Sequence, residues 1–560
     1  MKKITCLLLC LGFLAMASAA QAFEAFSGST ELLYHDETKA QNGVNMFSAG
    51  LKKGKGQNWI LDNNGQKVNL IYSQGQGNYM QMTQEGYLLL NGTSTEANAS
   101  DTYNLFTNGG GAGVVELTKW NGKNILTLKV FGADYRQHHE VRRIWNKKLG
   151  EYTYLMIVWE RLGAEDAEAL GVDPVYEDGY ANGWTPDAIW EMNSKGEVVW
   201  RWVFVDHVVQ NYDPSKTEPF TDVCGRYHPG ATYGDPADYP GKININYKTI
   251  SGGPKTDWNH CNSLDYNPES GHIAINSREW SEFYVIDHDG TFVSTTDWAK
   301  NIAATQTEAG DFLWRWGAPH IYGAGQAPGY FSSGDQQLFN AHNVQWIGLG
   351  CDYEGWEKAM GTIPGHGNIL IYDNGQTNPV EHRSRVLEIN PYGANGEYLW
   401  QEDGGYTVTM SNPLSFYKLS NMLVWRYQSH LANSFYSPII SSCQRMPNGN
   451  TIIDSGYNGH FFEVTKEGEV VWEYINPIIT AGASETLDDA QSMQMNLVSQ
   501  NMVYRMLRVP MKHPGLKGKN MYPQGTITGK TPGSSSDGDS GGDGGGGSGG
   551  GGAGGGGGGY

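Results

Sequence analysis

The residues of this sequence with the clearest potential for catalysis are five histidines. His138 and His139 occur in RQHHEVRRIW, His260 in DWNHCNSLDY, His342 in NAHNVQWIG and His460 in SGYNGHFFEV. Near neutral pH an imidazole can attack an electrophile, transfer a proton or donate a hydrogen bond to an anion. Each of these histidines lies at or near the start of a predicted β-strand, so their chemistry depends on whether the fold brings them together.

A repeated pattern of β-hairpins indicates how they could meet. Six segments share an apolar strand, a turn centred on Gly and a second strand: NWILDNNGQKVNLI from Asn58, VVELTKWNGKNILTL from Val114, AIWEMNSKGEVVWRW from Ala188, EFYVIDHDGTFV from Glu282, VLEINPYGANGEYLW from Val386 and FFEVTKEGEVVWEY from Phe461. A second hairpin, such as MTQEGYLLLNG, follows each of the first five, and NMVYRMLRV supplies the expected last strands. Two hairpins form one four-stranded sheet, and six such sheets in radial array form a six-bladed β-propeller.

Composition and spacing agree with an all-β fold. The chain has 18 Trp, 32 Tyr and 75 Gly, and these are strand and turn formers. The turn glycines are further apart than the roughly 40 to 50 residues of a minimal blade. Long insertions must therefore connect the strands, and loops of this length often carry function.

The repeats predict a shared site. His139, His260 and His342 open the second hairpin of three successive repeats, so they should point at a common axis, and His460 opens the first hairpin of the sixth repeat near the same channel mouth. We expect a pocket lined by several imidazoles. The alternative for any single histidine is a structural hydrogen-bonding role, which is commoner for an isolated residue at a strand start.

Metal binding ranks second among the functions of this histidine set. Three imidazoles can bind zinc or copper. No carboxylate or thiolate stands within two residues of His342 or His460 to complete such a site. We therefore predict no metal and no other cofactor.

The chain ends and charge limit the compartment and the partners. Residues 1–22 have a basic start, an apolar run and an A-x-A motif, which predict a signal peptide and a periplasmic or secreted protein without a membrane anchor. Residues 23–520 should form the propeller, and the Gly-rich residues 531–560 a disordered tail. The net charge of −20 disfavours nucleic acid, and it means that an anionic substrate needs a local cluster of positive or hydrogen-donating groups.

Four cysteines follow the predicted signal peptide: Cys224, Cys261, Cys351 and Cys443. Their separations match no zinc ribbon or CxxC pattern. In an oxidising compartment the default expectation is one or two disulfides, whose pairing the sequence leaves open.

Longer motifs resemble a known family. GDFLWRWGAP, DQQLFNAHNVQWIG, GNILIYDNG, SRVLEINP, FYSPIISSCQRMPNGNTIIDSGYNGHFFEVTKEGEVVWEYINP and VYRMLRVPMKHPGLKGK are together similar to the bacterial arylsulfate sulfotransferases, over most of residues 44–520. The resemblance implies a six-bladed propeller, export to the periplasm, and transfer of sulfate between phenols without a nucleotide donor. It also implies a ping-pong reaction through a histidine that accepts sulfate covalently.

The resemblance also implies roles for particular residues. His260 and His342 match positions that contact the sulfuryl oxygens, and His460 looks like the position of the sulfated histidine. The family has an arginine soon after DNG, whereas in DNGQTNPVEHRSR the first arginine comes later. The resemblance therefore implies that Arg383 or Arg385 binds sulfate. Of the two, Arg385 has the more structural character because it starts the next strand.

Asn343 and His139 complete the expected substrate-binding set, with aryl sulfates and phenols as the small-molecule partners. The N-terminal region is too short for the separate β-sandwich of the enteric members, which leaves the oligomeric state open. Two alternatives come from other classes of protein. A binding or scaffold propeller without catalysis uses the same fold, whereas a quinoprotein-like oxidoreductase would need a calcium carboxylate cluster and a cofactor platform that this sequence lacks.

Overall fold

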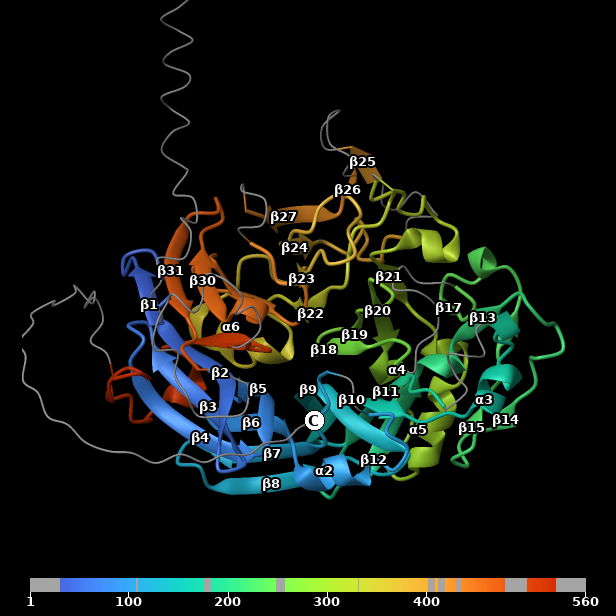
Figure 1. The fold of residues 1–560 in the computed structure, drawn as a ribbon, viewed down its shortest axis with the longest axis horizontal. Coiled ribbons are helices and arrows are strands. Elements are labelled where there is room, and N and C mark those ends of the chain that lie inside the picture. The colour runs from blue at the N-terminus through green and yellow to red at the C-terminus, as the bar shows by residue number, and fades with distance from the viewer. Residues whose placement is uncertain are drawn as a thin grey trace, which may run out of the picture.

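The computed structural model describes residues 31–106, 109–175, 183–247, 257–330, 332–400, 408–410, 418–429, 435–478 and 501–529. The predicted signal peptide, 1–22, and the predicted tail, 531–560, lie outside these residues. The described chain forms six antiparallel sheets around one axis (Figure 1), which confirms the six-bladed β-propeller.

We number the six sheets as blades 1 to 6 and give their strands from the axis outward. They are β32 (Met506–Pro510), β2 (Gly43–Lys52), β3 (Lys55–Asp62) and β4 (Lys67–Gln74) in blade 1; β5 (Gln76–Met82), β6 (Tyr87–Thr93), β7 (Val114–Lys119) and β8 (Asn124–Lys129) in blade 2; β9 (Tyr135–Asn146), β10 (Glu151–Glu160), β11 (Asp187–Met192) and β12 (Val198–Val203) in blade 3; β18 (Cys261–Asn267), β19 (His272–Ser277), β20 (Glu282–Asp287) and β21 (Trp314–Trp316) in blade 4; β22 (His342–Trp346), β23 (Ile369–Asp373), β24 (Arg385–Ile389) and β27 (Leu423–Tyr427) in blade 5; and β28 (Ser442–Arg445), β29 (Thr451–Ser455), β30 (His460–Val464), β31 (Val470–Ile475) and β1 (Glu31–His35) in blade 6. The first strands of neighbouring blades contact one another around the axis.

Both ends of the described chain close the ring. β32 pairs with β2, where Asn45 lies opposite Arg508, and β1 pairs with β31, where Leu32 lies opposite Tyr474. The last strand predicted from NMVYRMLRV is thus the innermost strand of blade 1. Ordered contacts extend past the predicted end of the domain at residue 520, because Thr528 Oγ1 donates a 2.7 Å hydrogen bond to Glu31.

The hairpins join into blades differently from the prediction. The Gly-centred segments begin with the third strand of each blade. In blades 2 to 6 that strand pairs with the hairpin that precedes it, whereas the repeats predict pairing with the one that follows. The fourth and fifth predicted hairpins are also wrong in their second halves. Gly290 lies in a short helix and β21 follows only after two helical segments, and β24 pairs with β27, which begins at Leu423 rather than directly after the turn at Gly396. The shift of one hairpin changes which residues are equivalent between blades.

Insertions between the strands hold the remaining elements. Residues 204–247, between blades 3 and 4, carry small sheets, and most helices occur between the strands of a single blade. These elements are α2 (Thr95–Ser100), α3 (Ala164–Ala169), η2 (Phe204–Asp206), β13 (Val208–Gln210), β14 (Phe220–Thr221), β15 (Tyr227–His228), β16 (Thr232–Tyr233), η3 (Pro236–Asp238), β17 (Ile243–Asn244), α4 (His288–Thr291), α5 (Trp298–Thr305), η4 (Glu308–Gly310), η5 (Pro319–Tyr322), η6 (Cys351–Tyr353), α6 (Trp356–Met360), β25 (Val408–Met410), β26 (Lys418–Ser420), η7 (Gly456–Asn458) and η9 (Pro514–Leu516). Among the described helices, none has the length and apolar character that a membrane crossing requires.

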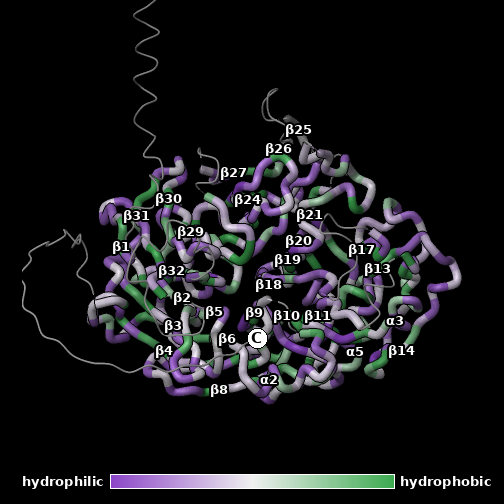
Figure 2. Tube along the Cα trace, viewed as in Figure 1, coloured by the Kyte–Doolittle hydropathy of each residue, from purple (hydrophilic) through white to green (hydrophobic). Residues whose placement is uncertain are grey.

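The hydrophobic core lies between neighbouring blades. The largest cluster packs Trp200 and Trp202 of blade 3 against Leu264 and Ile275 of blade 4, and all four side chains are buried. Alternating strands place apolar side chains on these faces. The innermost strands β9 and β18, near the centre of Figure 2, include hydrophilic stretches. The axis is therefore the polar part of the interior.

His288 links blades 3 and 4 by charge and gives a pH-dependent stability. Its Nε2 lies 2.8 Å from Oε2 of Glu191, and its Nδ1 lies 2.9 Å from Oδ1 of Asp289. Burial by itself lowers the pKa of His288, but the two carboxylates outweigh burial and raise the pKa to about 9. The stabilisation is therefore complete below the unfolded pKa of about 6.5 and is lost as the pH rises through about 9.

We expect the variant His288→Gln to unfold at a lower temperature than the wild type at about pH 6, and the difference to shrink by about pH 10. Thermal unfolding at both pH values measures this. An equal difference at both would show that the ion pairs contribute no pH-dependent stability.

Candidate functional site at the propeller axis

Three consecutive blades bring histidines to one end of the axis. His139 lies in β9, His260 immediately precedes β18 and His342 begins β22, and these are the innermost strands of blades 3, 4 and 5. The rings of His139 and His260 are 4.8 Å apart between centroids and nearly perpendicular. Both residues have left-handed backbones, with φ of 49° and 46°. Such conformations are uncommon outside glycine and concentrate at functional sites.

His139 is the outer member of a buried row of polar groups. Its Nδ1 lies 2.7 Å from Nδ1 of His138, and Nε2 of His138 lies 2.9 Å from Oδ1 of Asp187. The second contact lacks the alignment of a hydrogen bond. Burial lowers the pKa of both histidines well below the usual value. No described residue hydrogen-bonds Nε2 of His139.

His260 is paired with a carboxylate. Its Nδ1 lies 2.5 Å from Oδ2 of Asp257, whose Oδ1 accepts a 3.0 Å hydrogen bond from the indole of Trp159. Burial alone lowers the pKa of His260, but Asp257 outweighs burial and raises it. The pairing keeps a proton on Nδ1 and leaves the Nε2 lone pair of the neutral ring available. The His260 side chain is 16% exposed, and no described residue hydrogen-bonds its Nε2.

His342 has both ring nitrogens occupied. Its Nδ1 lies 2.6 Å from Oδ1 of Asn374, and its Nε2 accepts a 3.2 Å hydrogen bond from the backbone N–H of Ile440. Burial, followed by the charge of Arg278, lowers the pKa of His342 well below its usual value. His342 is therefore a neutral ring with a fixed tautomer, and its lone pair is already engaged.

Arg278 is a member of the site that the sequence did not reveal. Its backbone N–H donates to the carbonyl of His260, and its Nη1 lies 2.5 Å from Oε1 of Glu279. Arg278 follows β19, whose end meets the start of β18 in an antiparallel pair. The sequence does contain a signal for Arg278: it directly follows the second strand of the hairpin that begins after His260.

The structure does not bring His460 into this group. His460 begins β30, the third strand of blade 6, and its Nε2 lies 2.8 Å from Oε1 of Glu473. The position equivalent to His260 lies just before β28, where Ile440 and Ser441 stand with left-handed φ values of 50° and 92°. The shifted hairpin pairing is the physical reason for this separation.

The other predicted binding residues have structural partners. Nη1 of Arg383 donates to the carbonyl of Ser429 at 3.1 Å, and Nη2 lies 3.0 Å from Glu381. Arg385 is buried at the start of β24, where its Nε lies 2.9 Å from Asp373.

Asn343 belongs to the axial polar groups. Its Oδ1 accepts a 2.8 Å hydrogen bond from the backbone N–H of Cys443, and its buried Nδ2 has no hydrogen-bond partner within the described part of the chain. Its φ of 57° repeats the left-handed conformation seen at His139 and His260. Asn343 thus faces the axis, next to His342 in the chain.

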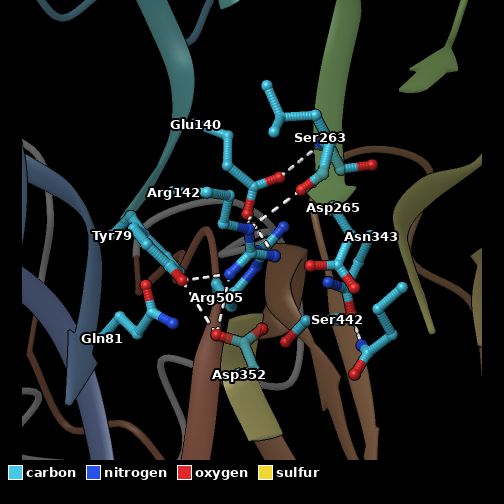
Figure 3. Close-up of polar contacts among 12 residues, drawn as sticks. Tyr79, Gln81, Glu140, Arg142, Ser263, Asp265, Asn343, Asp352, Ser442 and Arg505 are labelled. Carbon is cyan, nitrogen blue, oxygen red and sulfur yellow. Dashed lines mark hydrogen bonds and ion pairs between the residues drawn. The ribbon is translucent and has the colours of Figure 1, made fainter. Parts of the chain in front are cut away.

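Below His139, charged side chains fill the axis. Arg142 lies 2.7 Å from both Glu140 and Asp352, Arg505 also pairs with Glu140, and the hydroxyl of Tyr79 lies 2.9 Å from Asp352 (Figure 3). All five side chains are buried. Buried charges are stable only when paired in this way. We call these five residues the axial ion network.

The cysteines do not pair. Cys224, Cys261, Cys351 and Cys443 are all free thiols, so the expectation of one or two disulfides is wrong. Cys261, Cys351 and Cys443 lie in β18, η6 and β28, and Cys224 lies in the turn between β14 and β15. Burial raises the pKa of Cys261, next to His260, well above the usual value. A thiol of this kind is a poor nucleophile. Among the described residues, no group of three or more His, Cys, Asp and Glu side chains is arranged to hold a metal ion.

The fold and this site define a class: a six-bladed propeller that carries imidazoles and an arginine at one end of its axis. Residues 172–323 match the profile of the family described as Arylsulfotransferase (ASST). The match supports the arylsulfotransferase family, which the motifs resemble, and with it aryl sulfotransferase activity in general. The matched segment includes Asp187, Asp257, His260 and Arg278.

Comparison with curated proteins finds no match. Among solved structures, the chain is similar to a protein of unknown function from Bacteroides caccae (10% identity, TM-score 0.35), to the periplasmic gluconolactonase PpgL of Pseudomonas aeruginosa (9%, 0.33) and to apo AztD from Citrobacter koseri (8%, 0.31). Each alignment covers 84% of this chain and 99%, 99% and 98% of the respective structure. Similarity this weak carries no argument about activity.

Proposed function

We propose that the protein transfers a sulfuryl group from an aryl sulfate to a phenolic acceptor, without a nucleotide donor, at the site formed by His139, His260 and Arg278. The observation that carries this proposal is the pair of imidazole rings 4.8 Å apart, each with an Nε2 that no described residue hydrogen-bonds, beside an arginine. The family match supports the same chemistry.

Local positive charge favours an anionic donor at this site. The whole chain has a net charge of −20, which disfavours anions in general. The charge of Arg278 lies close enough to His139 and His260 to act on both rings, so Arg278 supplies a cationic donor at the site. Donors aimed at the sulfuryl oxygens would stabilise the charge that develops during transfer.

His260 is the nucleophile that the geometry favours. Neutral His260 attacks sulfur through Nε2, the bond between sulfur and the aryl oxygen breaks, and the phenol leaves. The N-sulfo imidazolium that forms keeps its Nδ1–H directed at Asp257, whose negative charge stabilises it. An acceptor phenol then attacks sulfur, the N–S bond breaks and His260 is restored. His460, which the resemblance favours, is the alternative nucleophile.

A chromogenic aryl sulfate tests the reaction. We expect purified protein to release the coloured phenol with 4-nitrophenyl sulfate as donor only when phenol is present as acceptor, and phenyl sulfate to appear as the product. Release of inorganic sulfate without acceptor would indicate a hydrolase, and no turnover across a range of donors and acceptors would favour a binding or scaffold propeller.

The compartment is part of the proposal. The signal-like residues 1–22 support a periplasmic or secreted enzyme. N-terminal sequencing of exported protein should find a chain that begins at Phe23, and retention of the full N-terminus in the cytoplasm would contradict it.

A further inference from the structure

A row of three titratable groups leads from the site into the protein. Nδ1 of His139 lies 2.7 Å from Nδ1 of His138, and Nε2 of His138 lies 2.9 Å from Oδ1 of Asp187. His138 and Asp187 are fully buried. The ring of His138 stacks on Trp159 at 3.9 Å with an interplanar angle of 5°, which holds its orientation. At the far end of the row, Nε2 of His139 has no hydrogen-bond partner among the described residues.

We infer that Asp187, His138 and His139 form a proton relay that gives a proton to the departing phenol and takes one from the incoming phenol. The inference rests on the proposed function. His139 would be the catalytic acid and base, and His138 and Asp187 would act through it as positioning and proton-storing residues.

With the 2.9 Å contact between His138 and Asp187 aligned as a hydrogen bond, the row allows two arrangements that differ by one proton. Two Nδ1 atoms 2.7 Å apart need exactly one proton between them. In the acid form, Asp187 is protonated and donates to Nε2 of His138, Nδ1–H of His138 donates to His139, and Nε2 of His139 carries a proton. In the base form, ionised Asp187 accepts from Nε2–H of His138, Nδ1–H of His139 donates to His138, and Nε2 of His139 is bare.

Sulfuryl transfer converts one form into the other. When the aryl oxygen departs, Nε2–H of His139 protonates it, the proton between the two histidines moves to His139, and the Asp187 proton moves to His138. When the acceptor phenol attacks, its proton reaches Nε2 of His139 and every shift reverses. The excess proton resides on Asp187, so neither histidine becomes a buried cation.

The surroundings of the row favour the acid form before reaction. Burial raises the pKa of Asp187 well above its usual value, and neighbouring Asp257 adds to this effect. Burial lowers the pKa of His138 and His139. The other charged or titratable groups that face the row are Arg136, His260, Arg278, His342, Cys261 and Tyr504. A relay that begins as an acid suits a reaction whose first event is loss of a phenol.

The variant Asp187→Asn separates the relay from a structural role. Oδ2 of Asp187 accepts a 2.6 Å hydrogen bond from the backbone N–H of Cys261, which requires an oxygen there. The new amide must therefore direct its NH₂ group at Nε2 of His138. This orientation keeps a proton on Nε2 of His139 but leaves no group that can take up or give out the excess proton.

The readout is the release of phenol in a single turnover from two donors. Phenyl sulfate has a poor leaving group that needs an acid, whereas 4-nitrophenyl sulfate has a good one. We expect Asp187→Asn to slow the release of phenol from phenyl sulfate by about 10²- to 10⁴-fold, which is the usual contribution of general acid catalysis. The release of 4-nitrophenol from 4-nitrophenyl sulfate should slow by less than about threefold. Asp454→Asn is the matched control, because Asp454 is also a buried carboxylate with a raised pKa but lies in β29 of blade 6.

Each other outcome overturns the relay. Equal losses with both donors would show a structural role, and no loss would show that Asp187 is not used. His138→Phe, which keeps the stack on Trp159, should give the same donor dependence if Asp187→Asn does not fold. Infrared spectra at neutral pH provide a readout without activity: a protonated carboxyl band should vanish in Asp187→Asn, and its absence from the wild type would overturn the relay. Failure of wild-type protein with both donors would instead refute the proposed function.

Discussion

Replacing His260 with alanine is expected to abolish sulfuryl transfer. The substitution removes the attacking Nε2 and the ring that Asp257 orients at 2.5 Å. The loss should exceed the roughly 10²- to 10³-fold that removal of one oxyanion donor usually causes. Because Asp257 raises the pKa of His260, the neutral nucleophile becomes dominant only above that raised value, so wild-type turnover should increase with pH through it.

Mass spectrometry identifies the nucleophile directly. After brief exposure to donor without acceptor, a sulfate adduct should occur on the peptide that contains His260. His460→Ala is the matched control: it changes a histidine at the same end of the propeller whose Nε2 contacts Glu473, and most activity should remain. An adduct on the His460 peptide, with loss of activity in His460→Ala, would assign the reaction to His460 instead.

The second large effect is expected in stability. Arg142 holds Glu140 and Asp352 at 2.7 Å within the axial ion network. Arg142→Met would leave these carboxylates in the interior with Arg505 as their remaining cation. Breaking a buried pair in this way costs about 3 to 5 kcal/mol of unfolding free energy. Denaturant unfolding of the variant and the wild type measures the difference.

Arg143 provides the control for Arg142. It is the next residue of β9, points to the opposite face and pairs at 2.8 Å with Glu85, whose side chain is 35% exposed. A partly exposed pair contributes about 1 kcal/mol or less, so Arg143→Met should be clearly more stable than Arg142→Met. Similar values for the two variants would show that the axial ion network does not stabilise the propeller.

The local elements of the fold were predictable because turns and strands have local causes. Gly122, Gly196 and Gly468 occupy turns with φ of 81°, 83° and 90°, which glycine adopts readily. Which hairpin joins which blade was not predictable from the repeats. Every hairpin has a similar neighbour before and after it, and only the pairing of β32 with β2 decides between them.

The way in which the hairpins join into blades explains which parts of the site could be predicted. His260 and His342 share the start of an innermost strand, so either pairing keeps them together. In the observed pairing, His460 begins the third strand of blade 6 instead of the innermost strand. This places His460 two strands further from the axis, roughly 10 Å at the usual strand spacing. Asp257 and Arg278 lie between strands, where insertion lengths rather than periodicity fix their positions.

The closure of the ring makes the axial ion network one of the last features that the folding chain can form. Asn45 and Arg508, which pair between β2 and β32, are 463 residues apart in sequence. Contacts of such high contact order form late because closing a long loop has a large entropic cost. The ring centroids of Tyr504 and His139 are 5.8 Å apart, and Arg505 completes the axial ion network. Both contacts can form only after β32 has paired with β2. Until then β2 has one unpaired edge that can associate with other chains, and no partly folded chain holds the complete axial ion network.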